Sequence, residues 1–315
     1  MILVLISHDR GQIEETTLQG LTAARSLGDD IHAVAIGAEI DGLGEFGVDV
    51  QHVISHDGLD DYSPSAWGSA LAQLVESLKP EAVVTTGTER GNEVMAHVGA
   101  ITGLPMVANC VAFDTSTDVW EITRTRWGGS LLEDASLDAP IRLVTITEHS
   151  TEQTPAESAG AATVEVFPPE LSENDLTTKI VDRVVTTEGL TLATSPVVVS
   201  GGRGVGSPEG FSSLEELADL LGGVVGCSRV VTNNGWRPHS DQVGQTGTVI
   251  APEVYIACGI SGAIQHWVGM MASNTIIAIN TDAEAPMVTK ADYAVIGDLS
   301  QIVPAIVAEV KARQG

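Results

Sequence analysis

The sequence predicts an α/β protein of two domains. Three observations indicate this fold class: apolar runs of strand length alternate with segments of helical period, a polar stretch interrupts the alternation, and a second series of strands and helices fills the last third of the chain. Strand–helix alternation is typical of a largely parallel sheet covered by helices. A chain of 315 residues can bury one core for each of two such sheets.

The first domain should contain a parallel sheet with covering helices. Helical periodicity spans residues 16–27, 64–78 and 91–102, and the last of these segments ends at the stop signals Gly103 and Pro105. The apolar runs that we predict as strands lie at residues 2–6, 31–36, 82–85 and 143–146.

A compositional break follows these elements. Residues 148–160, EHSTEQTPAESAG, are small or polar and have no periodicity, so we predict a loop or linker. A strand at 164–167 and a helix at 171–186 should follow it. We place the domain boundary near residue 190, which gives domains of 1–189 and 190–315.

The second domain repeats the alternation. We predict strands at residues 197–200, 254–257, 275–279 and 294–296, and helices at 213–221, 262–271 and 301–311. The carboxyl ends of parallel strands meet at one edge of a sheet, where ligands bind in open α/β folds. Polar and glycine residues that follow these strands are therefore candidates for a binding site.

The chain is strongly acidic, with a formal net charge of −27 and four lysines. Nucleic acid and anionic membrane surfaces repel such a chain, so we expect neither as a partner. Either an acidic patch for a basic partner or adaptation of the whole surface to high salt explains the charge. Because the acids are spread along the chain and salt screens their repulsion, we favour the second explanation and a halophilic source.

Three cysteines without a CxxC pair predict neither a disulfide framework nor a cysteine-rich metal site. Reduced thiols in a cytoplasm are the simplest interpretation. The chain begins with a strand-like run, so we expect no signal peptide. No apolar stretch approaches the roughly 20 residues that span a membrane, so we expect no direct membrane insertion.

Glycine-rich and polar segments follow several strands of the second domain. They are SGGRGVG at 200–206, GCSR at 226–229, QVGQTG at 242–247 and CGISGAIQH at 258–266. Glycines let the backbone approach a pyrophosphate, and a following helix offers unpaired N–H groups. The first segment is not G-x-G-x-x-G, and each segment alone could be a structural turn. Together they predict a long nucleotide lying across a crevice at one sheet edge.

These segments, with AIN at 278–280 and APMVTKADYAVIGD at 285–298, resemble the FAD domain of the electron transfer flavoprotein α subunit and its nitrogen-fixation relatives. The resemblance is dense from residue 197 to 310. Before that it covers only the strand–helix pattern and RWGG at 126–129. For the first domain, the resemblance implies an adenine-nucleotide-hydrolase-like fold that serves mainly as a docking scaffold. For the second domain, it implies a Rossmann-like FAD-binding fold.

The resemblance also implies which residues contact FAD. Arg203 matches the arginine of the glycine loop, and Arg229 matches an arginine over the isoalloxazine ring. Thr246 matches a threonine near the reactive flavin nitrogen, and His266 a histidine near a flavin carbonyl. The complete implied set is Arg203, Ser228, Arg229, Val243, Gly244, Gln245, Thr246, Ser261, Gly262, Ala263, Ile264, Gln265, His266 and, at the adenosine end, Asn280, Asp298 and Leu299.

The resemblance implies electron transfer by a carrier, and the sequence shows no Ser-His-Asp set and no HExxH that would indicate a different chemistry. The resemblance implies a heterodimer with a β subunit, electrons from acyl-CoA or other flavin dehydrogenases of fatty acid β-oxidation, and delivery to a quinone oxidoreductase of the respiratory chain. Three alternatives stay open. They are an electron-bifurcating flavoprotein fed by NADH, a nicotinamide-nucleotide-binding module, which would lack the QVGQTG and SGAIQH pair, and a scaffold that has lost its flavin.

Overall fold

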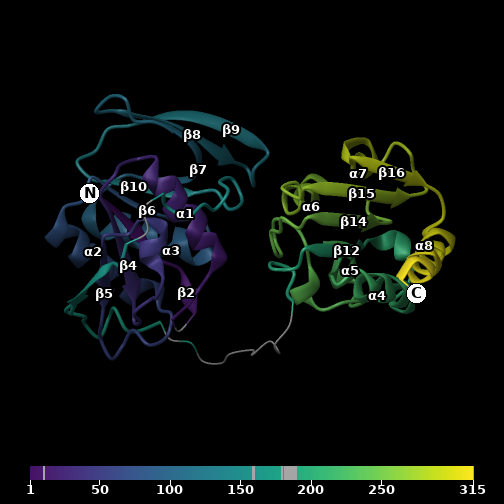
Figure 1. Cartoon of the computed structure of the whole chain (residues 1–315), viewed down its shortest axis with the longest axis horizontal. Coiled ribbons are helices and arrows are strands. Elements are labelled where there is room, and N and C mark those ends of the chain that lie inside the picture. Colours follow the sequence, from purple (N-terminus) through teal and green to yellow (C-terminus); the bar gives the residue numbers. More distant parts are fainter. Residues whose placement is uncertain (10, 158–159, 179, 181–189, 315) are drawn as a thin grey trace. The chain divides into compact units, whose positions relative to one another are not determined.

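The computed structural model describes residues 1–9, 11–157, 160–178, 180 and 190–314, and the chain divides into two compact units. The first comprises Met1–Trp127 with Leu131–Val185, and the second comprises Thr186–Gly315 with the short segment Gly128–Ser130. Each unit contains its own sheet (Figure 1). The boundary that we predict near residue 190 adjoins residues 181–189, which lie outside the described part.

The sheet of the first unit is parallel over most of its width. Its described strands are β1 (Ile2–Leu5), β4 (Ile31–Ile36), β5 (Val50–Ile54), β6 (Ala82–Thr86), β7 (Met106–Asp114), β8 (Trp120–Arg126), β9 (Leu131–Leu137), β10 (Arg142–Ile146) and β11 (Thr163–Phe167). They lie in the order β11-β5-β4-β1-β6-β10-β7-β8-β9. Pairing is parallel from β11 to β7 and antiparallel from β7 to β9. All five strands that the sequence predicts in this unit are confirmed.

Helices cover both faces of this sheet. They are α1 (Glu15–Arg25), α2 (Pro64–Leu78) and α3 (Glu89–Thr102). Val4 packs in the core on the α1 side, whereas its neighbour Leu3 packs on the side of α2 and α3, as the period of two in a strand requires. Thr88 caps α3 by accepting a hydrogen bond from the Gly91 N–H at 3.0 Å. The three predicted helices are confirmed to within a few residues at their ends.

The predicted helix at 171–186 is wrong in its described part. Residues 173–176 form a turn, and Asp175 accepts hydrogen bonds from the Ser172 N–H at 2.8 Å and the Ser69 hydroxyl at 2.5 Å. Leu171 and Leu176 pack against the same core as α2. The apolar spacing that suggests a helix therefore belongs to a non-helical segment whose leucines pack against the core beside α2. Residues 179 and 181–186 lie outside the described part.

The second unit holds a parallel sheet of described strands in the order β13-β12-β14-β15-β16. They are β12 (Val197–Gly201), β13 (Val224–Cys227), β14 (Val254–Cys258), β15 (Thr275–Asn280) and β16 (Tyr293–Ile296). The helices are α4 (Ser212–Leu220), α5 (Arg229–Asn233), α6 (Ile264–Val268), α7 (Pro286–Lys290) and α8 (Leu299–Gln314). The four predicted strands, α4 and α8 are confirmed. The predicted helix at 262–271 is shorter, because Gly262 is left-handed with φ +82°.

The strand order of this unit reverses beside β12. The chain moves from β12 to β13 on one side and then returns to β14, β15 and β16 on the other. The ends of these strands are level, since Gly201 of β12 pairs with Cys227 of β13 and with Cys258 of β14. Loops that leave such a point diverge and open a crevice at the carboxyl edge of the sheet.

Candidate functional site

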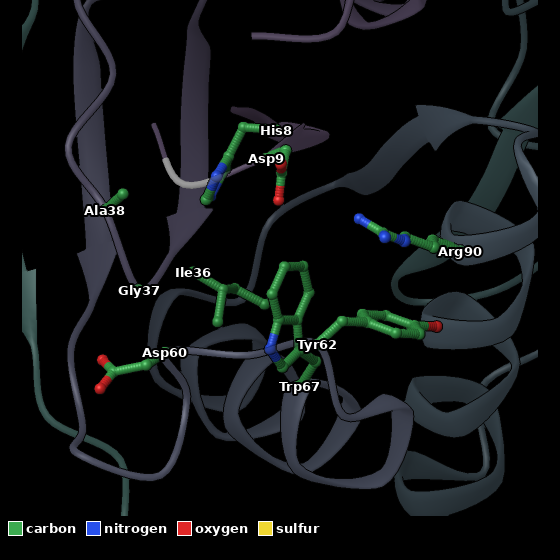
Figure 2. Close-up of a pocket in the computed structure, with 9 residues that line it drawn as sticks. All are labelled: His8, Asp9, Ile36, Gly37, Ala38, Asp60, Tyr62, Trp67 and Arg90. Carbon is green, nitrogen blue, oxygen red and sulfur yellow. The ribbon is translucent and has the colours of Figure 1, made fainter. Parts of the chain in front are cut away.

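A cavity of about 290 Å³ lies at one end of the first unit's sheet (Figure 2). Several of the side chains that line it contact one another. Trp67 meets Tyr62 edge to face at 5.2 Å, Arg90 lies 5.0 Å above the Tyr62 ring, and the Tyr62 hydroxyl donates to Glu93 at 2.7 Å. Burial lowers the pKa of His8, which keeps its imidazole neutral. The cavity is walled by a mutually packed aromatic cluster.

A larger cavity, of about 530 Å³, lies at the carboxyl edge of the second unit's sheet. Its walls are the segments that follow β12, β13, β14 and β15, together with the loop after η4 (His239–Asp241). The lining residues are Arg203, Gly204, Ser228, Arg229, Val230, Asn233, Gln242, Val243, Gly244, Thr246, Gly259, Ile260, Ser261, Ala263, Gln265, His266, Asn280, Asp282 and Ala285. The crevice that the strand order creates is thus a real pocket.

Two glycine loops meet at the floor of this pocket. The Gly204 N–H donates to the Gly259 carbonyl at 3.0 Å, and the Gly202 N–H donates to the Cys258 carbonyl at 2.8 Å. A Cβ atom on Gly204 would lie 2.7 Å from the Gly259 Cα, closer than packed atoms allow. Glycine is therefore required where the loops after β12 and β14 cross, and it leaves their backbone open to a ligand.

The loop at 242–248 holds a hydroxyl group at the pocket wall. The Val243 N–H donates to the Cys227 carbonyl at 2.9 Å, which ties the loop to the end of β13. The buried Gln242 side chain donates to the Thr246 hydroxyl at 3.0 Å and accepts from Thr232 at 2.6 Å. Thr246 is exposed and lines the pocket. Its hydroxyl accepts the hydrogen bond from Gln242, so its own proton is free to be donated to a ligand in the pocket.

Two guanidinium groups give the pocket its charge. Arg203 lies in the 3-10 turn η2 (Arg203–Val205), and Arg229 is the first residue of α5. Neither forms an ion pair with another of the described residues, and Asp282 is the one acidic side chain in the lining. Two cations without an ion-pair partner in the described part of a chain of net charge −27 indicate an anionic ligand.

His266 supplies a buried polar atom without a protein partner. Its Nε2 lies 2.7 Å from the hydroxyl of Tyr255, whereas its Nδ1 is buried and has no hydrogen-bond partner among the described residues. Burial lowers the pKa of His266 to about 4, so the ring is neutral near pH 7. An unpaired buried nitrogen at a cavity wall is costly unless a ligand satisfies it.

The structure brings eleven of the sixteen sequence-predicted site residues to this pocket, and five lie outside its lining. The five are Gln245, Gly262, Ile264, Asp298 and Leu299. Asp298 accepts hydrogen bonds from the Ser300 N–H and hydroxyl at 2.9 and 2.8 Å, so its carboxylate caps α8. The Leu299 side chain is buried in the core and approaches Gly259, and Ile264 is exposed. Contacts of these five with a cofactor stay a prediction.

Several lining residues are absent from the predicted set. Gln242 and Gly259 belong to the quoted segments QVGQTG and CGISGAIQH, so the signal that could have found them was present. Asp282 lies two positions after Asn280, in the loop that follows β15. Val230 has no comparable signal, because an apolar residue in the first turn of a helix is common in any core.

The fold and the pocket define the class of protein. The site combines a parallel sheet whose strand order reverses, glycine loops that cross at that point and two guanidinium groups without an ion pair among the described residues. Together they form a binding site for an anionic nucleotide cofactor. Residues 191–271 match the family described as "Electron transfer flavoprotein FAD-binding domain", and residues 2–172 match "Electron transfer flavoprotein domain".

Relatives match over nearly the whole chain. The chain is 38% identical over 321 residues to the electron transfer flavoprotein subunit alpha of Mycobacterium leprae, covering 99% of each chain. It is 33% identical over 323 residues to that of Thermoanaerobacterium thermosaccharolyticum, covering 98% and 97%. It is 35% identical over 329 residues to the protein FixB of Bradyrhizobium diazoefficiens, covering 99% and 89%. The chain belongs to the electron transfer flavoprotein α-subunit family, and FAD is its cofactor.

Proposed function

We propose that this chain is the FAD-carrying subunit of a heterodimeric electron transfer flavoprotein, which accepts electrons from acyl-CoA or other flavin dehydrogenases and passes them to the respiratory chain through a quinone oxidoreductase. The observation that carries the proposal is the pocket beside β12, which is lined by Arg203, Arg229 and His266, whose buried Nδ1 has no hydrogen-bond partner among the described residues. When bound there, FAD supplies the ring that takes up and releases electrons. The protein's own groups bind it, orient it and tune its potential.

The residues divide into two sets by their chemistry. Arg203, beside the crossing glycine loops, fits the pyrophosphate, because a guanidinium forms forked hydrogen bonds to phosphate oxygens. Arg229, Thr246 and His266 offer a charge, a hydroxyl and a ring nitrogen, which suit the flavin ring. Asn280 donates to the Ile260 carbonyl at 3.0 Å and borders the remaining part of the pocket, where the adenosine end would lie.

The partner subunit follows from the same proposal. The curated relatives of Mycobacterium leprae and Thermoanaerobacterium thermosaccharolyticum are named as alpha subunits, and the chain aligns with them almost end to end. We propose that a β subunit of the same flavoprotein completes the complex.

The proposed compartment rests on the cysteines. Cys110, Cys227 and Cys258 are free and buried, and burial raises the pKa of each thiol to about 12. Inert, reduced thiols support a cytoplasmic location. No helix among the described residues combines the length and the apolar character needed to cross a membrane.

The test is anaerobic electron delivery to the complex purified after co-expression with its β subunit. Reduced acyl-CoA dehydrogenase should bleach the flavin absorbance, and the bleached complex should reduce a quinone oxidoreductase. Bleaching by NADH in the absence of any dehydrogenase would instead favour the bifurcating branch. A complex that neither donor reduces would contradict the proposal.

A further inference from the structure

A fully buried tyrosine of β14 contacts the histidine of the pocket. The Tyr255 hydroxyl and the His266 Nε2 are 2.7 Å apart, and the two side chains are 0% and 6% exposed. The ring centroids lie 6.1 Å apart with an interplanar angle of 51°, so the two rings are tilted and do not stack. The contact between them is the hydrogen bond. Tyr255 does not line the cavity. His266, which does line the cavity, is the residue through which the Tyr255 hydroxyl can act on the pocket.

The direction of this hydrogen bond decides which ring nitrogen carries the proton. A neutral imidazole has one N–H donor and one lone pair. If the Nε2–H donated to the phenol, the buried phenol would need another acceptor for its own proton. The buried Ser200 Oγ has no hydrogen-bond partner among the described residues, so it does not accept that proton. That arrangement would leave the phenolic O–H unpaired in the core, which is costly.

The opposite arrangement leaves neither the phenolic O–H nor the Nε2 of His266 unpaired. Burial raises the pKa of Tyr255 and lowers that of His266, so the phenol keeps its proton and the imidazole stays neutral. The phenol can then donate to Nε2 of His266. The ring proton of His266 therefore belongs on Nδ1, the nitrogen that has no hydrogen-bond partner within the described chain.

We propose that Tyr255 is a positioning residue of the flavin site: it donates its phenolic proton to Nε2 of His266 and so fixes the tautomer that presents Nδ1–H, as a neutral donor, to the bound flavin. The inference rests on the proposed placement of His266 beside the flavin ring. A neutral N–H that is already oriented stabilises the negative charge that reduction adds to the ring, without burying a cation in the oxidised state.

The first test measures the tautomer by NMR in the FAD-loaded complex with its β subunit, labelled with ¹⁵N-histidine. His266→Gln identifies the signals of His266 by their loss. The wild type should show Nδ1–H, and Tyr255→Phe should shift the tautomer ratio at least about tenfold towards Nε2–H, because the phenolic donor is gone. Tyr293→Phe is the matched control, since Tyr293 is 65% exposed and lies on β16 of the same unit. It should leave the ratio unchanged.

The wild-type measurement needs no variant, so the proposal is tested even if Tyr255→Phe does not fold. A wild-type His266 with its proton on Nε2 would overturn the proposal, and so would a Tyr255→Phe protein that keeps Nδ1–H. If no FAD is bound at all, the proposed function fails, while the same NMR measurement on the cofactor-free chain still decides whether Tyr255 sets the tautomer.

The second test is a spectroelectrochemical titration of the same proteins. Tyr255→Phe should make flavin reduction less favourable, lowering its equilibrium constant by about tenfold, the effect of losing one hydrogen bond to a charged group. His266→Gln should change the constant in the same direction, and Tyr293→Phe should not change it. An unchanged reduction equilibrium in Tyr255→Phe would overturn the link between this pair and the flavin.

Discussion

Replacing Arg229 with alanine should lower the first reduction potential of the bound flavin. Arg229 is the first residue of α5 and lines the pocket, and it has no ion pair among the described residues that would cancel its charge locally. A positive charge beside the ring stabilises the negative charge that reduction adds. Removing this charge therefore penalises the reduced state more than the oxidised state.

The magnitude follows from the surroundings of the side chain. Arg229 is exposed at the pocket wall, so the effective dielectric constant lies between that of a protein surface and that of water. A unit charge at about 4 Å interacts by about 4 kcal/mol at a dielectric constant near 20 and by about 1 kcal/mol in water. About 59 mV corresponds to roughly 1.4 kcal/mol for a one-electron couple. The expected fall is about 40–170 mV, with FAD still bound.

Spectroelectrochemical titration of matched variants measures this effect. Arg229→Lys should recover part of the loss, because the charge remains while the planar guanidinium does not. Arg203→Ala removes the other guanidinium of the pocket, beside the glycine loops. Arg203→Ala should weaken FAD binding. The reduction potential of the FAD that stays bound should fall less than in Arg229→Ala.

Potentials of Arg229→Ala within about 20 mV of the wild type, with FAD retained, would refute the electrostatic role and leave Arg229 a structural residue. An equal fall in Arg203→Ala would show that the effect is a general loss of charge in the pocket. Either result would remove the reason for placing Arg229 beside the ring.

Three further outcomes are expected. Gly204→Ala should weaken FAD binding at least about tenfold in calorimetric titration, since its Cβ would lie 2.7 Å from the Gly259 Cα, whereas Gly160→Ala, which meets open space, should not. Urea unfolding should show stability lost as the pH falls from 6.5 to about 4, by about 3 kcal/mol, because His266 binds its proton only in the unfolded chain over that range; His266→Gln should remove this loss. Folding and flavin retention should need molar salt, where the Debye length is about 3 Å, and a melting temperature unchanged in about 50 mM salt would contradict this.

Helices with one apolar face could be predicted from the sequence, because their period is local. Residues 64–78 predict a helix that coincides with α2, and residues 16–27 predict α1 to within two residues. The antiparallel pair β8 and β9 has no such signal, since most of β9 is exposed and shows no apolar alternation. The segment at 171–178 misled the prediction because its leucines pack against α2 from a turn.

The site could be predicted as a set of segments but not as a geometry. Glycine and polar residues at strand ends indicated the crevice, and the parallel sheet brings eleven of the sixteen residues to it. Asp298 also follows the end of a strand, yet its carboxylate caps α8. The distinction depends on Ser300 two residues later and on the start of a helix, which a strand-end rule does not include.

Tyr255 shows the limit most clearly. In the sequence it stands within the apolar run at 254–257, where an aromatic residue is typical of a core strand. Its hydroxyl meets His266 only because β14 and α6 pack against each other, and nothing in the spacing of eleven residues indicates that contact. Burial and the unpaired Nδ1 of His266, which are tertiary properties, reveal the pair.

The central claim is that the pocket beside β12 holds FAD, and the most direct test is a cofactor count. The complex should be purified after co-expression with its β subunit, the nucleotide released by acid and identified by chromatography, and the amount compared with that of the α chain. We expect FAD in the wild type, about one molecule for each α chain, and a lower count in Arg203→Ala because that variant binds FAD more weakly. Recovery of NAD, of no nucleotide, or of a count that Arg203→Ala leaves unchanged would contradict it.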